Sequence, residues 1–498
     1  MTSAKHIDIV GAGLAGMTAA LRLRQLGYAV SLHESSKFLG GQAGSRLSRG
    51  RWQDHGYHVV FPWYLNMRAM MAELGIIGNF VELAAFHQLR SGAYPNFGGG
   101  LRAPKWDPLR EALAGLGLGD RICYYYMLAD LVWDQDGDES IASFLNRRWY
   151  SSEPIRRELD RLVAAACTPA TDYSTRTLRT LLSAFARHSQ PACGWKPSRS
   201  LQESLIAPFH RRLEEIGVEV NTGWRMSGLT LDGSGRATEL VLQTPQGEVR
   251  RRPAGIVLAV PHHEVARLGS AFVERSGLAG NGFDRLRSHA ESALHLYTKR
   301  PIEHLPKEHF WLVESRYEVS MLDVSSWNPG SGSALSLVLS ASRELLPMAP
   351  EDAARAVVDE AQRYIPSITW DNIADFGFLP NTDAPLFSND ANSWAARPAQ
   401  STGVRNVWLA GDYTRTHIDA ACMENAVTSG VLAANAVQAA EHPTGARIPV
   451  LRPVPVSRLE AAAAKTVLFP LALGAKLAGY SRRKPTPGST LVARRAGS

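Results

Sequence analysis

The chain has 498 residues, of which 45% are hydrophobic and 20% are charged, and its formal net charge is +7. These values are typical of a soluble globular protein large enough for two or three domains. The charge is uneven, because residues 441–498 hold ten Lys or Arg against two acidic residues, a balance of +8 that leaves −1 for residues 1–440. A nearly neutral body argues against nucleic-acid binding.

Cysteine usage and the start of the chain bear on the compartment. The four cysteines, Cys123, Cys167, Cys193 and Cys422, have no C-x-x-C spacing, which indicates buried thiols, a reducing compartment and no zinc site. The chain passes from Met1 through a few polar residues directly into a strand pattern, without a secretory hydrophobic region. We therefore expect a cytoplasmic protein.

The first predicted elements form a dinucleotide-binding β-α-β unit. Residues 7–10 are an apolar run typical of a buried parallel strand, and Gly11, Gly13 and Gly16 follow it at G-x-G-x-x-G spacing. In this motif the first glycine makes the tight turn, the second lets the backbone approach a pyrophosphate, and the third lets the next helix pack closely on the sheet. The N-terminus of that helix offers free N–H groups to the phosphates.

The following residues are in register with this motif. A helix is expected over about 14–26 and a second strand over 28–33. Glu34 directly follows that strand, at the position of this motif where an acidic side chain accepts hydrogen bonds from ribose hydroxyls. Residues 403–430 predict a further strand, turn and helix at the other end of the chain. We interpret the two ends as halves of one cofactor site, for a flavin rather than a nicotinamide.

Between these ends the pattern changes character. Residues 51–65 have an unusual density of histidine and aromatic residues around one glycine, and helical patterns dominate from about 65 to 213. Within them, residues 123–133 are apolar nearly all round, which predicts either a buried helix or a wall of an apolar substrate tunnel.

Strand patterns return in the second half of the chain. They lie at 218–221, 227–231, 239–244, 255–260, 293–298 and 335–339, and a helix is expected near 351–364. His262, His263 and Glu264 follow the fourth of these strands. Adjacent side chains project in different directions, so we expect no metal site there.

The last segment is basic and apolar. Residues 461–480 are strongly apolar, but Lys465 and Lys476 leave an uncharged run of only ten residues, 466–475. Such a run is too short to span a bilayer, which needs roughly 20 apolar residues. Two interpretations remain open: a segment in the interface of an anionic membrane, with basic residues 482–484 at the headgroups, or a helix docked on the protein core or on a second subunit.

The motifs at the two ends together resemble one family. The chain is similar to the flavin-containing amine oxidase and carotene desaturase superfamily in the glycine motif with Glu34, Gly40-Gly41, Asp54-His-Gly-Tyr-His58, Leu409-Ala-Gly-Asp-Tyr-Thr and Met423-Glu-Asn-Ala-Val-Thr-Ser-Gly430. Within it the chain most resembles the branch of phytoene desaturase, ζ-carotene desaturase and hydroxysqualene dehydroxylase. The resemblance covers about residues 5–440 and leaves the tail outside.

The resemblance implies an α/β fold in which a Rossmann-like FAD-binding domain of the GR2 type is interleaved with a mixed α+β substrate domain. On this basis the FAD-binding domain takes residues 1–64, 201–289 and 396–440, and the substrate domain takes residues 65–200 and 290–395. Residues 441–498 then form the basic, apolar C-terminal tail.

The resemblance also implies, residue by residue, a set of cofactor contacts. The residues expected to bind FAD are Gly11, Gly13, Ala15, Gly16, Glu34, Ser35, Gly40, Gly41, Gln42, Gly56, Met226, Gly411, Asp412, Met423 and Ala426. Gly411 and Asp412 correspond to positions at the ribityl-diphosphate, and Met226 to a valine whose backbone meets the adenine. The helix after Ala421 would direct its N–H groups at the flavin pyrimidine edge, where reduced flavin carries negative charge.

The candidate catalytic residues are His55, Tyr57 and His58 around Gly56, and Arg300 after a later strand. The histidines have an alternative interpretation as a buried structural pair, because desaturation needs little acid–base help beyond positioning. Three further positions differ from the family pattern: Gln42 stands in place of an arginine, and Pro62 and Asn425 stand in place of glycines. These differences bear on the substrate rather than on the fold.

Three functions follow from these observations. We favour a desaturase or dehydrogenase of a long apolar isoprenoid of the carotene or squalene type, in which hydride passes to flavin N5. An amine oxidase is the first alternative, but the strand at 291–300 has no lysine around 292–294, since Lys299 is displaced toward its end. A non-redox flavin-dependent isomerase is the second, and a non-enzymatic binding protein is disfavoured.

The expected partners follow from the favoured function. They are a lipophilic small-molecule substrate, a quinone or other electron acceptor, and a membrane surface contacted by the tail, with no nucleic acid and no metal. We expect the protein in the cytoplasm, with a peripheral position on the inner face of the membrane if the tail is an anchor.

Overall fold

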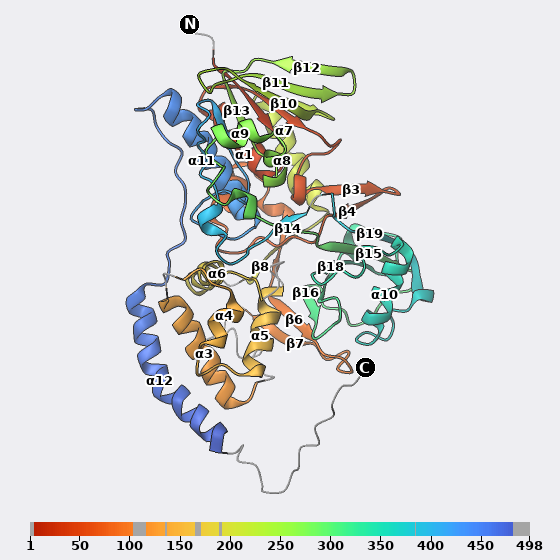
Figure 1. The fold of residues 1–498 in the computed structure, drawn as a ribbon. Helices are drawn as coiled ribbons and strands as arrows, with labels where there is room; N and C mark the ends of the chain where they lie inside the picture. Colours follow the sequence, from red (N-terminus) through yellow and green to blue (C-terminus); the bar gives the residue numbers. More distant parts are fainter. Residues whose placement is uncertain are drawn as a thin grey trace, which may run out of the picture.

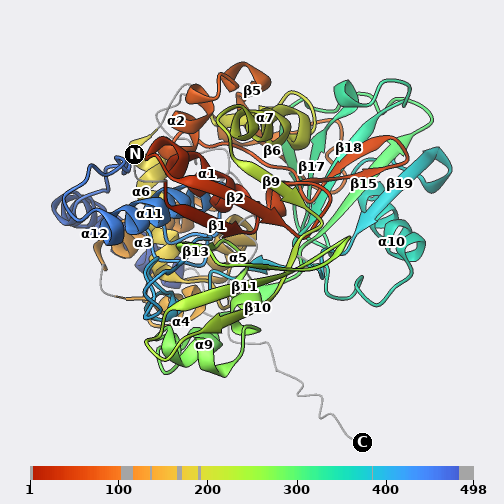
Figure 2. The same ribbon diagram turned by 90° about the horizontal axis from the view of Figure 1, so that it is seen from above.

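The computed structural model describes residues 4–102, 116–134, 137–164, 171–188, 192–383 and 385–481 (Figures 1 and 2). Cys167 and the basic residues 482–484 and 494–495 lie outside the described residues. Figure 1 shows a parallel sheet with its helices at the top, a second large sheet at the lower right, and a group of helices at the lower left.

The upper sheet has five parallel strands drawn from distant parts of the chain. Their order is β21-β13-β1-β2-β9. Their bounds are His6–Val10 (β1), Ala29–Glu34 (β2), Glu219–Thr222 (β9), Gly255–Leu258 (β13) and Val407–Leu409 (β21). The strands predicted at 7–10, 28–33, 218–221 and 255–260 are therefore confirmed, with small shifts at their ends.

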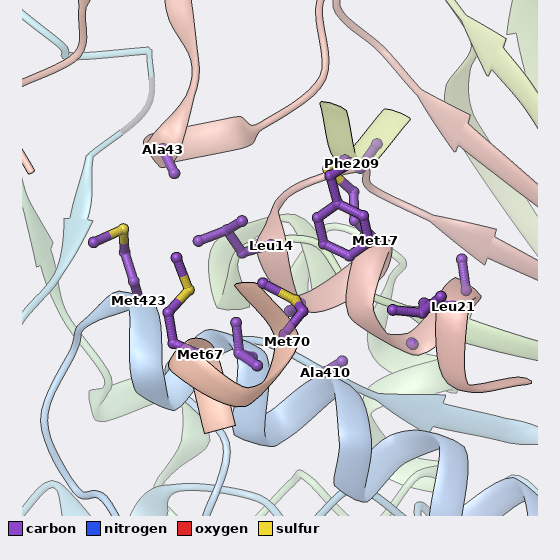
Figure 3. Close-up of a cluster of buried hydrophobic side chains, with 14 of the residues drawn as sticks. Leu14, Met17, Leu21, Ala43, Met67, Met70, Phe209, Ala410 and Met423 are labelled. Carbon is purple, nitrogen blue, oxygen red and sulfur yellow. The ribbon is translucent and has the colours of Figure 1, made fainter. Parts of the chain in front are cut away.

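Alternate residues of these strands pack on opposite faces of the sheet. Ile7 and Ile9 of β1 lie in a core that holds α1 (Leu14–Gln25), α2 (Leu65–Glu73), α7 (Ala207–Glu215) and α11 (Met423–Glu441). Figure 3 shows side chains of this core, among them Met17 of α1, Met70 of α2 and Phe209 of α7. Val10 lies in a second core on the other face.

The second core is closed by an antiparallel sheet of three strands, β10-β11-β12, and by two short helices. The bounds are Arg225–Leu231 (β10), Ala237–Thr244 (β11), Gly247–Arg251 (β12), His262–Ala266 (α8) and Ser270–Arg275 (α9). The parallel sheet is thus covered on both faces, as its nearly continuous apolar strands require.

Two glycines allow close packing around α1. A Cβ on Gly16 would lie 1.9 Å from the carbonyl O of Gly11, and a Cβ on Gly430 of α11 would lie 2.4 Å from the carbonyl O of Ala15. Both distances are shorter than any non-bonded contact. The turn before α1 and the crossing of α1 with α11 therefore depend on these glycines.

The second large sheet has seven strands in the order β19-β15-β18-β17-β16-β6-β7. The bounds are Ala85–Leu89 (β6), Gly98–Arg102 (β7), Ser292–Thr298 (β15), His309–Leu312 (β16), Val319–Asp323 (β17), Ala334–Leu339 (β18) and Ile373–Leu379 (β19). One face packs on α10 (Pro350–Gln362) through Leu335, Leu337 and Leu339 of β18 and their neighbours. The strands predicted at 293–298 and 335–339 and the helix near 351–364 are confirmed.

The region from 65 to 213, expected to be mainly helical, also contains strands. Besides β6 and β7, it holds β5 (Phe80–Leu83) and β8 (Gly194–Pro197), which pair with each other. Helices dominate this region as expected, but the sequence did not indicate these strands, because β6 obtains its register from β16, which lies in the second half of the chain. A pairing between such distant segments leaves little local signal.

Helices and short strands make up the remainder. The helices at the lower left of Figure 1 are Leu118–Trp133 (α3), Ile141–Asn146 (α4), Glu153–Ala164 (α5) and Thr175–Arg187 (α6). The short strands are Ser45–Ser48 (β3), Arg51–Asp54 (β4), Ser288–His289 (β14) and Leu386–Phe387 (β20). The apolar helix predicted at 123–133 is confirmed as part of α3.

The tail forms a long helix, α12 (Arg458–Ser481), which lies along α3 at the outer edge of Figure 1. The Nζ of Lys465 lies 2.6 Å from Asp130 Oδ1, and the Nζ of Lys476 donates to the carbonyl O of Ser151 at 2.7 Å. Ala461 and Ala472 are buried on the same side. Of the two interpretations of the tail, the helix docked on the protein core is therefore present.

The opposite side of α12 is apolar and exposed. The exposed fractions are 82% for Leu459, 68% for Val467, 55% for Leu471 and 62% for Leu477. By length and composition, Arg458–Gly479 is also long and apolar enough to cross a membrane, although we expected its lysines to prevent this. In the structure the two lysines face the protein, which leaves the outer face without them.

Candidate active site

A large cavity of about 1820 Å³ lies between the parallel sheet, the seven-stranded sheet and the helices at the lower left. Fourteen of the fifteen predicted FAD-binding residues line it: Gly11, Gly13, Ala15, Glu34, Ser35, Gly40, Gly41, Gln42, Gly56, Met226, Gly411, Asp412, Met423 and Ala426. Gly16 does not line it and acts through the close packing described above. His55, Tyr57 and His58 also line the cavity.

The glycine turn gives the cavity a cradle without side chains. The backbone N–H of Gly40 donates to the carbonyl O of Ala12 at 2.8 Å, which holds the residues around Gly40 and Gly41 beside the turn. A Cβ on Gly13 would have no atom closer than 3.9 Å, so the protein leaves open space there. The N-terminus of α1 has no side-chain cap, and its free N–H groups face a site that fits a pyrophosphate.

Glu34 is fixed at the end of β2 beside this cradle. Its Oε2 accepts a hydrogen bond from the backbone N–H of Ala12 at 2.8 Å, and its Oε1 accepts one from the N–H of Ser36 at 2.8 Å. The side chain is only 9% exposed, and that surface lines the cavity. Oε1 also accepts from Ser35 Oγ at 3.2 Å, whereas Oε2 keeps a further lone pair, as a partner for a ribose hydroxyl needs.

The other end of the chain supplies the opposite side of the cradle. Burial raises the pKa of Asp412 to about 6, and the positive charge of Arg397 opposes this shift. The first turn of α11 has no side-chain cap at Cys422, and Met423 and Ala426 line the cavity. An uncapped helix N-terminus stabilises negative charge, which suits the pyrimidine edge of a reduced flavin.

Asn425 explains one difference from the family pattern. Its Nδ2 donates to the carbonyl O of Asp412 at 2.6 Å, and its Oδ1 accepts from Thr416 Oγ1 at 2.6 Å. A glycine would make neither bond. The asparagine therefore fastens the loop around Asp412 to α11. Gln42 also has a structural partner, since its Nε2 donates to the carbonyl O of Pro385 at 2.8 Å.

Glu424 connects two helices next to the cradle. It is completely buried, and its carboxylate accepts from the backbone N–H groups of Asn66 at 2.9 Å and Met67 at 2.8 Å. It therefore caps α2, whose own N-cap residue Tyr64 supplies no side-chain bond. Burial raises the pKa of Glu424 to about 7. Sequence analysis did not identify this role, because capping from another helix has no local signature.

The three catalytic candidates follow β4, where the two large sheets meet. The backbone at this point is held from both sides, since His295 Nε2 lies 2.9 Å from the carbonyl O of Asp54 and Asn381 Nδ2 donates to that of His55 at 2.8 Å. Burial lowers the pKa of His58 to about 4, so its imidazole is neutral at pH 7.

Tyr57 is positioned by two residues that sequence analysis missed. Its Oη lies 2.5 Å from His309 Nε2 and 2.5 Å from Ser320 Oγ. Burial lowers the pKa of His309 to about 3, so this ring is also neutral. His309 is in β16 and Ser320 in β17, both far from Tyr57 in the sequence. Only the pairing of the seven-stranded sheet brings them together.

Arg300 is not brought to this cavity. It follows the end of β15, where its backbone N–H donates to Asn372 Oδ1 at 3.0 Å, and it does not line the cavity. Its position outside the cavity lining gives no support to the prediction of Arg300 as a catalytic residue. Lys299 next to it donates to the carbonyl O of Asp371 at 2.7 Å and is also remote. Among the described residues that line the cavity there is no lysine.

Beyond the cradle the cavity is mainly apolar. Its walls include side chains of α3, α6 and α12, among them Tyr124, Leu128, Leu181, Phe185 and Leu468. The segment at 123–133 is therefore both part of a buried core and a wall of the cavity. In the described part of the chain, no group of three or more His, Cys, Asp or Glu is arranged to hold a metal ion.

Comparisons with known proteins agree with this geometry. The chain is 25% identical to a probable zeta-carotene desaturase of Synechococcus elongatus, over 88% of this chain and 99% of that protein. It is also 25% identical to a carotenoid phi-ring synthase of Streptomyces griseus, over 87% of this chain and 88% of that protein.

Solved structures share the fold at lower identity. Cyclohexylamine oxidase from Brevibacterium oxydans has a TM-score of 0.64 at 16% identity, over 88% of this chain and 99% of its own. An oxidoreductase from Methanosarcina mazei has a TM-score of 0.66 at 13% identity, over 85% and 98%. The predicted α/β FAD-binding fold is confirmed. The profile of the flavin containing amine oxidoreductases matches residues 14–438. The chain belongs to this family and is an FAD-dependent oxidoreductase.

Proposed function

We propose that the protein is a desaturase or dehydrogenase of a long apolar isoprenoid. The observation that carries this proposal is the large cavity, which continues from the glycine cradle into an apolar chamber without a lysine among its described lining residues. Its volume of about 1820 Å³ exceeds the roughly 300–1,000 Å³ of ordinary small-molecule sites, which leaves room for a lipid beside the cofactor. Similarity to carotenoid enzymes supports the same substrate class.

We divide the roles between two parts of the chain. Residues 1–64, 201–289 and 396–440 would form the cofactor half, with the N-termini of α1 and α11 and Glu34 as its polar contacts. Residues 65–200 and 290–395 would form the substrate half. When bound, FAD supplies the acceptor for a hydride from a substrate C–H bond.

The remaining chemistry falls to the residues after β4. Loss of hydride must be accompanied by loss of a proton from the neighbouring carbon. The neutral imidazole of His58 is able to take up a proton but not to retain it, because burial lowers its pKa to about 4. Tyr57, fixed by His309 and Ser320, would orient the chain, and the apolar walls would exclude water.

Two alternatives use the same cavity. An amine oxidase would require the cavity to accept a small polar amine. The mainly apolar walls disfavour this alternative, and so does the absence of a lysine among the described lining residues. A flavin-dependent isomerase would consume no electron acceptor. Anaerobic mixing of the oxidised protein with polyenes, triterpenoids and primary amines distinguishes the three.

We expect the flavin absorbance to bleach with polyenes or triterpenoids only, and a quinone to restore it. Bleaching by amines alone would show that the protein is an amine oxidase. Turnover of an isoprenoid without net bleaching and without an acceptor would favour the isomerase.

We also propose that α12 lies on an anionic membrane surface, on the inner face of the cytoplasmic membrane. The orientation of its charges supports this position, because Lys465 and Lys476 contact the protein while leucines and a valine face outward. A surface helix of a soluble protein has the reverse arrangement. Because α12 also forms a wall of the cavity through Ala464 and Leu468, a substrate dissolved in the bilayer would have a short route inward.

Sedimentation with anionic liposomes tests this position. Val467→Asp and Leu471→Asp should abolish binding without loss of FAD, since both side chains are exposed in the free protein. Ile77→Asp is the matched control, because Ile77 is similarly exposed at 54% but lies on a different surface. Unchanged sedimentation of the two α12 variants would contradict the proposal.

A further inference from the structure

The face of the seven-stranded sheet that meets the cavity has an unexpected composition. On the opposite face, Phe310 of β16, Met321 of β17 and Leu89 of β6 pack in the core under α10. On the cavity face, three adjacent strands present Ser320, Trp311 and Gln88, all of which line the cavity. A wall that contacted only hydrocarbon would be apolar here.

These three side chains form a continuous row across the sheet, the polar row. Trp311 of β16 is paired directly with Ser320 of β17 on one side and with Gln88 of β6 on the other. Neighbouring strands are about 4.8 Å apart, so the row spans roughly 10 Å. Ser320 is paired on its other side with Val338 of β18. The Cγ2 of Val338 would lie 3.4 Å from a Cβ on Gly56. The polar row therefore begins one strand away from the catalytic candidates.

Two members of the polar row offer hydrogen-bonding groups to the cavity. Gln88 is 9% exposed, and this surface lines the cavity. The indole N–H of Trp311 is buried and has no hydrogen-bond partner in the described part of the chain. Buried polar groups in proteins are nearly always paired, since otherwise their desolvation is not compensated.

The chemistry of these groups defines the missing partner. An indole N–H only donates, and an amide both donates and accepts, so the complementary group is an oxygen with a lone pair. A hydroxyl or a carbonyl on a lipophilic chain meets this requirement, whereas a pure hydrocarbon does not. A neutral oxygen fits the row, because none of its three side chains carries a charge.

We propose that the polar row binds the oxygen atom of an oxygen-bearing lipophile. This inference rests on the proposed function, because the lipophile shares the reaction cavity. Two sources have this chemistry: an isoprenoid substrate with a hydroxyl or keto group, and a quinone electron acceptor. Binding at the row would place the oxygen one to three strand spacings from Gly56. It would thus fix which carbon of the chain lies beside the catalytic candidates.

The test compares ligands that differ only in the oxygen. Holoprotein is titrated with β-carotene, β-cryptoxanthin and echinenone, which share one carbon skeleton and carry no oxygen, one hydroxyl and one ketone. The amount of pigment that stays with the protein after removal of free ligand reports binding. The proposal predicts a preference of about five- to tenfold for the oxygenated compounds, the effect of one hydrogen bond. Gln88→Leu should abolish the preference without weakening β-carotene binding.

A second arm examines the quinone. Anaerobically reduced protein is reoxidised with decylubiquinone, and the concentration dependence of the rate gives the apparent affinity. If the quinone is the ligand of the row, Gln88→Leu weakens this affinity about five- to tenfold and leaves the carotenoid titrations unchanged. Trp311→Phe, which keeps an aromatic ring but removes the N–H, provides a second variant in both arms.

Ser336→Ala is the matched control. Ser336 lies in β18, is buried with a hydroxyl that has no partner in the described part of the chain, and does not line the cavity. Loss of the oxygen preference, or of quinone affinity, in the polar-row variants but not in this control would support the proposal. No change in either arm would overturn it. Failure of all three carotenoids to bind, with normal quinone kinetics, would instead count against the proposed substrate class alone.

Discussion

Replacement of Glu34 tests whether the carboxylate at the end of β2 serves the fold, the cofactor or both. Its two backbone hydrogen bonds, from Ala12 and Ser36, are both 2.8 Å long and exist in the protein without FAD. A hydrogen bond to a charged group contributes about 1.5–3 kcal/mol, so Glu34→Ala should lower the free energy of unfolding of the apoprotein by roughly 3 kcal/mol. The two N–H groups would lose a buried partner.

The same substitution should weaken FAD binding separately. Loss of a charge-assisted bond to the ribose corresponds to an increase in Kd of about ten- to a hundredfold. Glu34→Gln keeps one acceptor oxygen and should give an intermediate value. Fluorescence titration of apoprotein with FAD measures Kd, and thermal unfolding with and without FAD separates the two effects.

Glu219→Ala provides the control for these measurements, because Glu219 belongs to the adjacent strand β9 but does not line the cavity. We expect little change in its FAD affinity. An unchanged Kd in Glu34→Ala, with only the thermal stability reduced, would refute the assignment of Glu34 to the ribose. Unchanged stability of the apoprotein would refute the energetic reasoning from its backbone bonds.

Three further predictions follow from the glycine cradle and from α11. Gly13→Ala should fold normally but fail to retain FAD, because its Cβ would enter the open space of the cradle. Gly16→Ala should fold poorly, because its Cβ would lie 1.9 Å from a backbone carbonyl O. FAD content and thermal unfolding distinguish the two variants. Burial raises the pKa of Glu424 to about 7 from its ordinary 4.5, so its stabilising contribution is present below pH 4.5 and is lost as the pH rises through 7. Glu424→Gln should flatten that decline in denaturant titrations, and an unaltered slope would mean that another group causes it. Asn425→Gly should reduce thermal stability and FAD affinity through loss of the bond to the carbonyl O of Asp412, and equal FAD affinity in both proteins would contradict this role.

Local patterns in the sequence predicted the cofactor side of the molecule well. The strand at 7–10, the helix after Gly13 and the second strand ending at Glu34 are encoded in one short continuous segment, so apolar runs and glycine spacing suffice to locate them. The predicted FAD-binding residues, apart from Gly16, line one cavity even though they come from both ends of the chain.

The substrate side could not be predicted to the same extent, for a physical reason. The partners of Tyr57, His309 and Ser320, lie on strands whose register depends on pairing between segments far apart in the sequence. Likewise, the composition of α12 indicated an apolar helix with two lysines, but not which way the lysines point. That orientation depends on Asp130, whose position is set by the packing of α3.

The strand order of the parallel sheet has a consequence for biosynthesis. β1 is at its centre, yet its neighbour β13 is made only after half of the chain, and β21, which closes the edge beyond β13, is made close to the end. During translation, β1 and β2 therefore lack a complete sheet until most of the chain has been made. Pairing of strands that are far apart in the sequence is slow, and the unpaired strands are prone to aggregation. The helix α11, whose first turn lines the cavity, is made later still. FAD is therefore expected to bind only the completed chain. Because its binding stabilises the native state, the supply of FAD affects the last step of folding.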